Sequence, residues 1–429
     1  MFRKRGPYEQ SIPSLAYQQP HRRPFRVVVI GLFAIAAVGL IAKQWQPVNP
    51  NIQQPEYKVT AQVTTQPLTK KGLRQQLTPF IHQGQYPSQI RHQDQTLDIT
   101  YTLDPALQAW AEARLKRYNP DYASFVALDP DTGKVLAMTS SRRDNGPSAD
   151  LPFKATYPGA STFKLITAVA VLEEGIATPN TVYSFNGKST SLYKSQVFST
   201  KRNKWTRDMS LTTAFAKSVN PIFGRIGAKQ LGAEKLSRYA LKYGYNAQFT
   251  SDFDFDNGSV NIDENDEWQV VEAASGYTRA NTLSPVHGAA IAASIINGGR
   301  LIPPSVVESV HNDAGDMLYE SSPPSIDVIT DQTSKRMQKL MQATVKDGSG
   351  RKNIGKLSRK KAFKNAVVGA KTGHLRGNNP KGSYDWIIGY GIHNDKRIAF
   401  AVMCINKEKW YVKSGDLARE ALEFYFKEP

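Results

Sequence analysis

Three short groups of residues combine the side chains that acyl transfer requires. Ser161-Thr-Phe-Lys164 places a hydroxyl and an amine three residues apart, Ser218-Val-Asn220 adds a second hydroxyl and an amide, and Lys371-Thr-Gly373 adds a cation. A serine becomes a nucleophile when a neighbouring base takes its proton, and a lysine with a lowered pKa is such a base. No pattern is specific alone, because S-x-x-K recurs at Ser191, Ser349 and Ser358, S-x-N at Ser259, and K-S-G at Lys413.

Ser161 stands out by its surroundings. Pro158-Gly159 interrupts the chain before it, and the apolar run that ends at Gly175 predicts a helix beginning near Ser161. Residues three apart lie on one helix face, so the Lys164 amine is expected to return to the serine. Unpaired N–H groups at a helix start favour an alkoxide and a developing oxyanion. An ordinary N-cap serine is the alternative, and the other S-x-x-K serines lie in polar, loop-like stretches.

Ser218 and Asn220 end a helix-like segment just before Pro221. The hydroxyl is suited to relay a proton between Lys164 and the leaving group, and the amide to orient Lys164 or the substrate. A simple cap or turn pair explains the same two residues.

Lys371, Thr372 and Gly373 follow an apolar strand, and two further strands come after them. Such a strand can bind a substrate backbone by strand addition, with the lysine and threonine holding an anionic carboxylate. Glycine would permit a close approach. The alternative is a surface lysine at a strand end.

The elements that must position these residues form a regular order along the chain. A strand and a helix opened by Asp104-Pro105 precede a hairpin at 123–139, the segment 161–300 is mostly helical with polar loops at 183–207 and 249–267, and three strands (365–373, 384–392, 397–404) and a helix (416–426) follow. Strands at both ends with helices between them predict an α/β (α+β) fold, in which an antiparallel sheet built from both termini is flanked by helices.

In this order and these settings, the three patterns resemble those of penicillin-binding proteins and serine β-lactamases. Residues 97–429 resemble the transpeptidase domain of high-molecular-weight penicillin-binding proteins, including YTLDPALQ, VALDPDTGKVLAM, YPGASTFK, TLSPVHGAAIAASIINGGRLIPP and VKDGSG. These segments most resemble the transpeptidase half of bifunctional class A enzymes, and the glycosyltransferase domain that precedes it in those enzymes is not expected here. The resemblance implies the penicillin-binding fold with an all-helical subdomain.

The resemblance also implies a substrate, the D-Ala-D-Ala stem peptide of peptidoglycan, and covalent inhibition by β-lactams. Ser161 would attack the penultimate D-Ala carbonyl, and the N–H groups of Ser161 and His374 would form the oxyanion hole. His374 departs from the family pattern, in which threonine or serine follows K-T-G. A hydroxyl that contacts the substrate carboxylate is therefore missing, and substrate preference is expected to differ there.

Three alternatives to a D,D-transpeptidase remain open from the sequence. A D,D-carboxypeptidase and a β-lactamase share the same acylation chemistry, although no well-placed glutamate is evident to activate a hydrolytic water. A β-lactam sensor or wall-synthesis scaffold that keeps a vestigial site is the third alternative. No cofactor is expected.

An apolar run at 27–42 predicts a single transmembrane helix. Basic residues concentrate before it, so residues 1–26 are expected to form a cytoplasmic tail and the rest to lie outside the bacterial cytoplasmic membrane, in the periplasm. A cleaved signal peptide is the alternative, but no small-x-small cleavage site follows the run. Either topology exports the domain, so nucleic acid is not an expected partner despite the net charge of +18.

Residues 43–95 are rich in glutamine with few large apolar side chains, and predict a linker or small pedestal before the transpeptidase domain at 96–429. Membrane tethering without a glycosyltransferase domain suggests a separate glycosyltransferase partner in a wall-synthesis complex. The histidines are scattered, and Asp252, Asp254 and Asp256 lack the glycine of a calcium loop, which Asn257 replaces, so no metal site is assigned. The basic stretch 351–364 fits either a contact with an anionic polymer or lipid, or a solvated loop.

Overall fold

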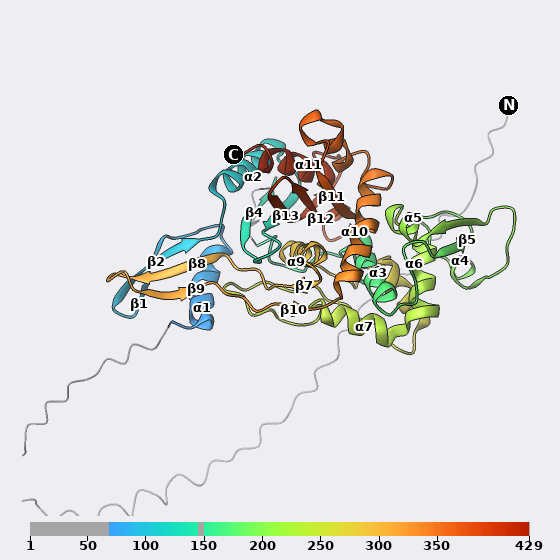
Figure 1. Ribbon diagram of the computed structural model, residues 1–429, viewed down its shortest axis with the longest axis horizontal. Helices are drawn as coiled ribbons and strands as arrows, with labels where there is room; N and C mark the ends of the chain where they lie inside the picture. The colour runs from blue at the N-terminus through green and yellow to red at the C-terminus, as the bar shows by residue number, and fades with distance from the viewer. Residues whose placement is uncertain (1–67, 145–149, 429) are drawn as a thin grey trace, which may run out of the picture. The chain divides into compact units, whose positions relative to one another are not determined.

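A five-stranded antiparallel sheet forms the centre of the fold. The computed structural model describes residues 68–144 and 150–428, and the sheet order is β11-β12-β13-β3-β4 (Figure 1). The strands are β3 (Tyr122–Leu128), β4 (Val135–Arg142), β11 (Val367–Asn378), β12 (Lys381–His393) and β13 (Lys396–Asn406). Strand β13 pairs with β3, so both ends of the domain meet in one sheet. The predicted antiparallel sheet and the β3–β4 hairpin are confirmed.

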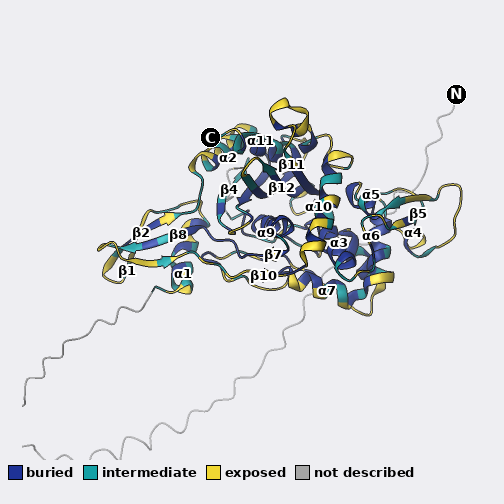
Figure 2. Cartoon of the chain, viewed as in Figure 1, coloured by how far each residue is buried: buried dark blue, intermediate teal, exposed yellow. Residues whose placement is uncertain are grey.

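Strand β13 shows why this sheet requires helices on both faces. Phe400 and Val402 pack in one core, whereas Ala401 and Met403 pack in the other. Successive side chains of a strand point to opposite faces, so a strand that is apolar throughout must be covered twice. Helices α2 (Pro105–Tyr118) and α11 (Ser414–Tyr425) cover the first face, and α9 (Pro285–Ile296) and α10 (Asp331–Lys346) cover the second. Figure 2 shows α9 as buried throughout.

Helix α2 begins as its sequence predicts. The Asp104 carboxylate accepts hydrogen bonds from the N–H groups of Ala106 and Leu107, and Pro105 occupies the first turn. An aspartate cap satisfies donors that have no partner within the helix, and proline there sacrifices no hydrogen bond. The predicted terminal helix is also confirmed, as α11.

The segment between β4 and α9 is largely helical. It contains η1 (Ala160–Phe163), α3 (Lys164–Glu173), α4 (Lys194–Phe198), α5 (Leu211–Ala216), α6 (Asn220–Ile226), η2 (Gly227–Leu231), α7 (Gly232–Lys242) and α8 (Glu267–Ser275). It is not all-helical, because β5 (Val182–Phe185) pairs with β6 (Arg207–Ser210). Asp208 accepts hydrogen bonds from Ser184 and Arg202 and joins the two strands. Strand β5 buries Tyr183 and Phe185, whereas the residues of β6 are exposed or half-buried. Because β6 lacks the apolar alternation that predicts a strand, the expected 183–207 loop needs this correction.

Ordered structure also begins earlier than Leu97. Helix α1 (Lys70–Ile81) buries Leu73, Leu77 and Ile81 along one face. It packs with a second sheet, in the order β1-β2-β8-β9. These strands are β1 (Gln89–His92), β2 (Gln95–Tyr101), β8 (Val307–Asn312) and β9 (Met317–Glu320), and the remaining short elements are β7 (Arg300–Leu301), β10 (Ile326–Asp327), η3 (Ile354–Arg359) and η4 (Lys361–Phe363). Residues 68–95, the described part of the segment predicted to be a linker or small pedestal, are thus folded.

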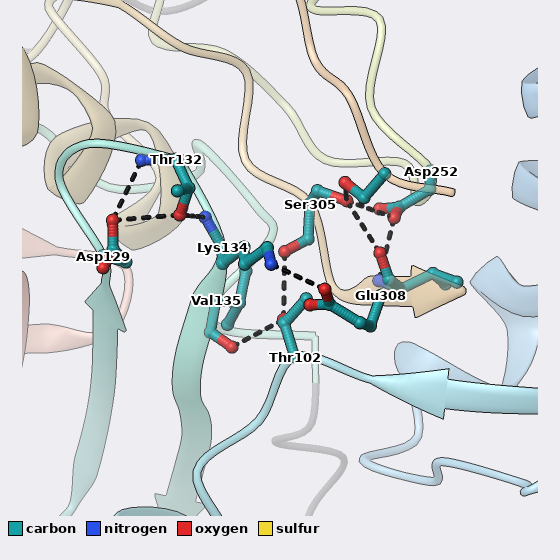
Figure 3. Close-up of polar contacts among 10 residues, drawn as sticks. Thr102, Asp129, Thr132, Lys134, Val135, Asp252, Ser305 and Glu308 are labelled. Atoms are coloured by element: carbon teal, nitrogen blue, oxygen red, sulfur yellow. Dashed lines mark hydrogen bonds and ion pairs between the residues drawn. The ribbon is translucent and has the colours of Figure 1, made fainter. Parts of the chain in front are cut away.

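A buried carboxylate lies where the two sheets are connected (Figure 3). Asp252 accepts hydrogen bonds from the Ser305 hydroxyl at 2.6 Å and from the N–H groups of Val306 at 3.1 Å and Val307 at 2.9 Å. Nearby, Lys134 pairs with Glu308 at 2.6 Å. Several donors compensate a buried carboxylate, so Asp252 fixes the start of β8.

The aspartates that follow in the sequence take separate partners. Asp254 pairs with Arg74 at 3.3 Å, and Asp256 with Lys154 at 3.6 Å. The described residues contain no cluster of three or more carboxylate, histidine or cysteine side chains suited to a metal ion. These carboxylates therefore serve structural contacts.

Within the described residues, no helix has the length and apolarity to span a bilayer. The predicted tail 1–26 and span 27–42 lie outside those residues, as does the segment 43–67. Both assignments stay predictions.

Candidate active site

Ser161 lies in η1, immediately before α3. Ala160 has a φ of 50°, an unusual left-handed conformation for a residue other than glycine. Gly276, at the end of α8, packs against this turn so closely that a Cβ would lie 2.1 Å from the Ala160 carbonyl oxygen. The end of α8 therefore packs directly against the turn that carries the serine, and only glycine fits there.

The Lys164 amine lies within hydrogen-bond reach of three oxygens. Its Nζ lies 2.8 Å from Ser161 Oγ and 2.7 Å from Asn220 Oδ1, and it also contacts the backbone carbonyl of Ser275. The Asn220 amide is oriented by its own N–H group, which donates to the Thr190 carbonyl at 2.9 Å. The sequence predicted the first two contacts, but the Ser275 carbonyl carries no side-chain signal.

These partners define what a neutral Lys164 can do. Asn220 Oδ1 and the Ser275 carbonyl oxygen only accept hydrogen bonds, so they take both N–H donors of a neutral amine. The remaining lone pair then faces the Ser161 hydroxyl, which is the arrangement of a base and its nucleophile.

Electrostatics favour that neutral form. Lys164 is fully buried, and burial lowers its pKa well below the usual value; the charge of Lys371 lowers it further. No comparable burial affects the lysines of the other S-x-x-K matches: Lys194, Lys352 and Lys361 are exposed. This difference agrees with the prediction that Ser161 and Lys164, and not the other S-x-x-K matches, form the nucleophile and base.

Lys371 and Ser218 meet beside this pair. Lys371 Nζ donates to Ser218 Oγ at 3.0 Å and to the Thr372 carbonyl oxygen at 2.8 Å. Burial lowers the pKa of Lys371 to about 7. Ser218 has a φ of 56°, which turns the chain sharply between α5 and α6. The alternative explanation of Lys371, a surface lysine at a strand end, is thus excluded.

Gly373 brings β11 against the start of α3. A Cβ there would lie 2.8 Å from the Gly159 carbonyl oxygen and 3.1 Å from Thr162. A larger residue would push the strand away from the serine turn. The spacing of K-T-G from S-x-x-K is therefore fixed by backbone packing.

Two side chains that the sequence did not predict, Trp410 and Ser349, contact His374 and Thr372 at the rim of the site. The exposed His374 ring stacks on Trp410, with centroids 5.6 Å apart and an interplanar angle of 18°. On the same side of β11, Thr372 Oγ1 lies 2.5 Å from Ser349 Oγ. Ser349 belongs to one of the other S-x-x-K matches, and Lys352 is exposed, so this pair does not resemble Ser161 and Lys164. The sequence did not predict the position of Ser349 beside Thr372.

Comparison with known proteins assigns the family. The model of the penicillin binding protein transpeptidase domain matches residues 123–423. The chain belongs to this family. The predicted family is confirmed, and the penicillin-binding transpeptidase domain thus accounts for the central sheet and the helical segment together.

Relatives within this penicillin-binding family are distant. Stage V sporulation protein D of Bacillus subtilis is 26% identical over 279 residues, covering 59% of this chain and 42% of that protein. Peptidoglycan D,D-transpeptidase PbpA of Mycolicibacterium smegmatis is 26% identical over 345 residues, covering 71% of this chain and 67% of that protein. The matched part thus spans less than half of the first relative and about two thirds of the second.

A solved structure shows the same fold. The imipenem acyl-enzyme complex of penicillin-binding protein A from Mycobacterium tuberculosis superposes with a TM-score of 0.64 at 22% identity, covering 77% of this chain and 80% of that chain. The predicted antiparallel penicillin-binding fold is confirmed, except for the all-helical subdomain corrected above.

Proposed function

We propose that this protein is a peptidoglycan D,D-transpeptidase that forms an acyl-enzyme through Ser161. The observation that carries the proposal is the buried Lys164 amine, which lies 2.8 Å from Ser161 Oγ and also contacts Asn220 Oδ1 and the Ser275 carbonyl. The substrate class follows from relatives named D,D-transpeptidases, and sensitivity to β-lactams from the acyl-enzyme complex of a structural neighbour.

In the first half-reaction, Ser161 Oγ attacks the penultimate D-Ala carbonyl while Lys164 takes the hydroxyl proton. The N–H groups of Ser161 and His374 stabilise the oxyanion. When the tetrahedral intermediate collapses, the C–N bond breaks, and the terminal D-Ala leaves as an amine with a proton delivered from Lys164 through Ser218. The N–H of His374 does not depend on its side chain.

In the second half-reaction, an acceptor amine attacks the ester carbonyl and loses a proton to Lys164. The bond between the acyl carbon and Ser161 Oγ then breaks, and Lys164 returns the proton to Oγ, which restores the free hydroxyl. Lys371 holds positive charge next to Ser218. Thr372 is the half-buried residue of K-T-G whose hydroxyl is offered to the substrate carboxylate. Lys371 is buried, and its positive charge attracts the substrate carboxylate.

The rest of the assignment follows from the sequence. We propose a single-pass anchor at 27–42 in the bacterial cytoplasmic membrane, with the domain on the wall side and a separate glycosyltransferase as partner. The proposal includes a transpeptidase domain that is similar to those of class A penicillin-binding proteins. Peptidoglycan stem peptides and β-lactams are the expected ligands.

The test offers a stem pentapeptide to the protein with and without a D-amino-acid acceptor. A transpeptidase yields the exchanged peptide when the acceptor is present, and Ser161→Ala yields none. Hydrolysed tetrapeptide as the only product would identify a D,D-carboxypeptidase, and rapid release of hydrolysed penicillin a β-lactamase. Binding of penicillin without any peptide turnover would indicate a sensor or scaffold.

A further inference from the structure

A cleft of 680 Å³ lies outside the catalytic residues, between the second half of α10, η3 and the start of β11. Its floor is aliphatic, with Val345, Ile354, Leu357 and Val368 buried. A hollow of this size holds a ligand of several residues or a drug-sized molecule. Nothing in the mechanism above uses it.

The rim of this basic cleft is strongly cationic. Lys339, Lys346, Arg351 and Arg359 line it and are exposed, and Asp347 is the acidic residue among them. Across residues 68–144 and 150–428, none of these four cations has an ion-pair partner. Neighbouring lysines differ: Lys335 pairs with Asp331 and Lys360 with Glu423, each at 2.6 Å. Unpaired like charges repel one another and favour an anionic ligand.

The basic cleft continues towards the catalytic residues. An adjoining hollow of 480 Å³ shares Asp347, Arg351 and Arg359 with it and is also lined by Ser349. Ser349 in turn contacts Thr372 of the K-T-G strand at 2.5 Å. A ligand in the basic cleft therefore lies on the same continuous surface as the substrate strand.

The wall between the two regions is fixed by its backbone. The Ser349 N–H donates to the Ala216 carbonyl at 3.0 Å, two residues before Ser218, and the Gly350 N–H donates to the Thr344 carbonyl at 3.0 Å. A Cβ on Gly355 would lie 2.4 Å from the Val345 carbonyl oxygen. The cleft is thus preformed and needs little ordering to bind.

We propose that the basic cleft binds a second stem peptide, an acidic peptide whose carboxylates meet the cationic rim and whose alanine methyl groups meet the aliphatic floor. The proposal rests on the proposed transpeptidase function, and it extends the substrate surface beyond the reacting bond. A membrane surface does not fit, because a planar surface cannot enter a concave cleft. A polyphosphate chain matches the charge but has no apolar groups for the floor.

The test separates this cleft from the catalytic residues. The protein is first acylated with penicillin, which occupies Ser161, and acylation is verified by mass. Binding of a dye-labelled stem pentapeptide is then followed by fluorescence anisotropy. The cleft variant is Lys339→Glu/Arg359→Glu, and the matched control is Lys356→Glu/Lys361→Glu. The control makes the same charge change with exposed lysines of the same region that do not line the cleft.

We expect saturable binding by the acylated wild type and the control, binding at least about 10-fold weaker in the cleft variant, and weakening with salt. Penicillin acylation is expected to be equal in all three proteins. Equal peptide binding by the cleft variant would overturn the proposal, as would anionic vesicles binding in its place with no peptide bound. Failure of penicillin to acylate the wild type would instead contradict the proposed function, and the difference between cleft variant and control would still be measured.

Discussion

Two copies of the S-x-x-K pattern lie near each other in the fold and have opposite environments. Lys164 is fully buried, with its amine held beside Ser161 at 2.8 Å. Lys352 is exposed, three residues after a serine that contacts Thr372 instead. The same spacing therefore produces a buried amine beside a serine in one region and a solvated cation in the other. Desolvation and fixed acceptors, more than the pattern, determine the chemistry of a lysine.

The largest effect is expected from removing the buried amine. Lys164→Met keeps an apolar stem of similar length but has no base, so penicillin acylation is expected to slow by about 10²- to 10⁴-fold. Stopped-flow measurement of acylation by a fluorescent penicillin gives the rate. The matched control is Lys361→Met, the exposed lysine after Ser358, which is expected to acylate like wild type. Equal slowing in both variants would remove the distinction between the two environments.

The acceptors around Lys164 are the next target. Asn220→Ala removes a buried hydrogen-bond partner of the amine, which predicts roughly 10- to 100-fold slower acylation. Asn220→Asp instead adds a negative charge, which favours the ammonium and raises the pKa of Lys164. The pH at which acylation is half-maximal should therefore move upward in the aspartate variant. A pH–rate profile that does not move would exclude Lys164 as the titrating base.

Lys371 is expected to link stability to pH. Its pKa falls to about 7 in the folded protein, so from pH 7 up to its ordinary pKa the unfolded chain binds more protons. The Lys371 contribution to the free energy of unfolding should accordingly rise with pH through this window and be lost as pH falls towards 7. Thermal melts of wild type and Lys371→Met between pH 7 and 9 measure it, because other titrating groups cancel in the difference. Parallel curves would show that Lys371 does not titrate there.

The smallest effect is expected at the exposed serine. Ser349→Ala removes one hydrogen bond to the Thr372 hydroxyl, with a net contribution of about 0.5–1.5 kcal/mol. Half-saturating substrate concentration should rise a few-fold while kcat is retained, in a steady-state assay on stem pentapeptide. Loss of acylation in Ser349→Ala would give this serine a role beyond positioning.

Much of this architecture was predictable from local patterns. The apolar runs in 397–404 and 384–392 and the Asp104 cap follow from rules that act within a few residues. The β5–β6 hairpin was not predictable, because β6 has no buried residue and its contacts with β5 include the polar pair Asp208 and Ser184. Helix α1 was missed since its apolar residues are few and widely spaced within a polar, glutamine-rich composition.

Some parts of the candidate site could also be predicted from the sequence, and others could not. Serine, lysine and asparagine of the motifs could be found by residue type and context. The Ser275 carbonyl could not, because any residue supplies a carbonyl, and the packing of Gly276 under Ala160 depends on a contact between segments more than a hundred positions apart. Trp410 and Ser349 reach the rim only through tertiary packing.

The account is tested most directly by mapping the penicillin adduct. The full chain is incubated with penicillin, digested, and its peptides are analysed by mass spectrometry. We predict one stable adduct on Ser161, absent from Ser161→Ala and strongly slowed in Lys164→Met. An adduct on Ser349, or one that persists in Ser161→Ala, would contradict the claim that the buried Lys164 selects the nucleophile.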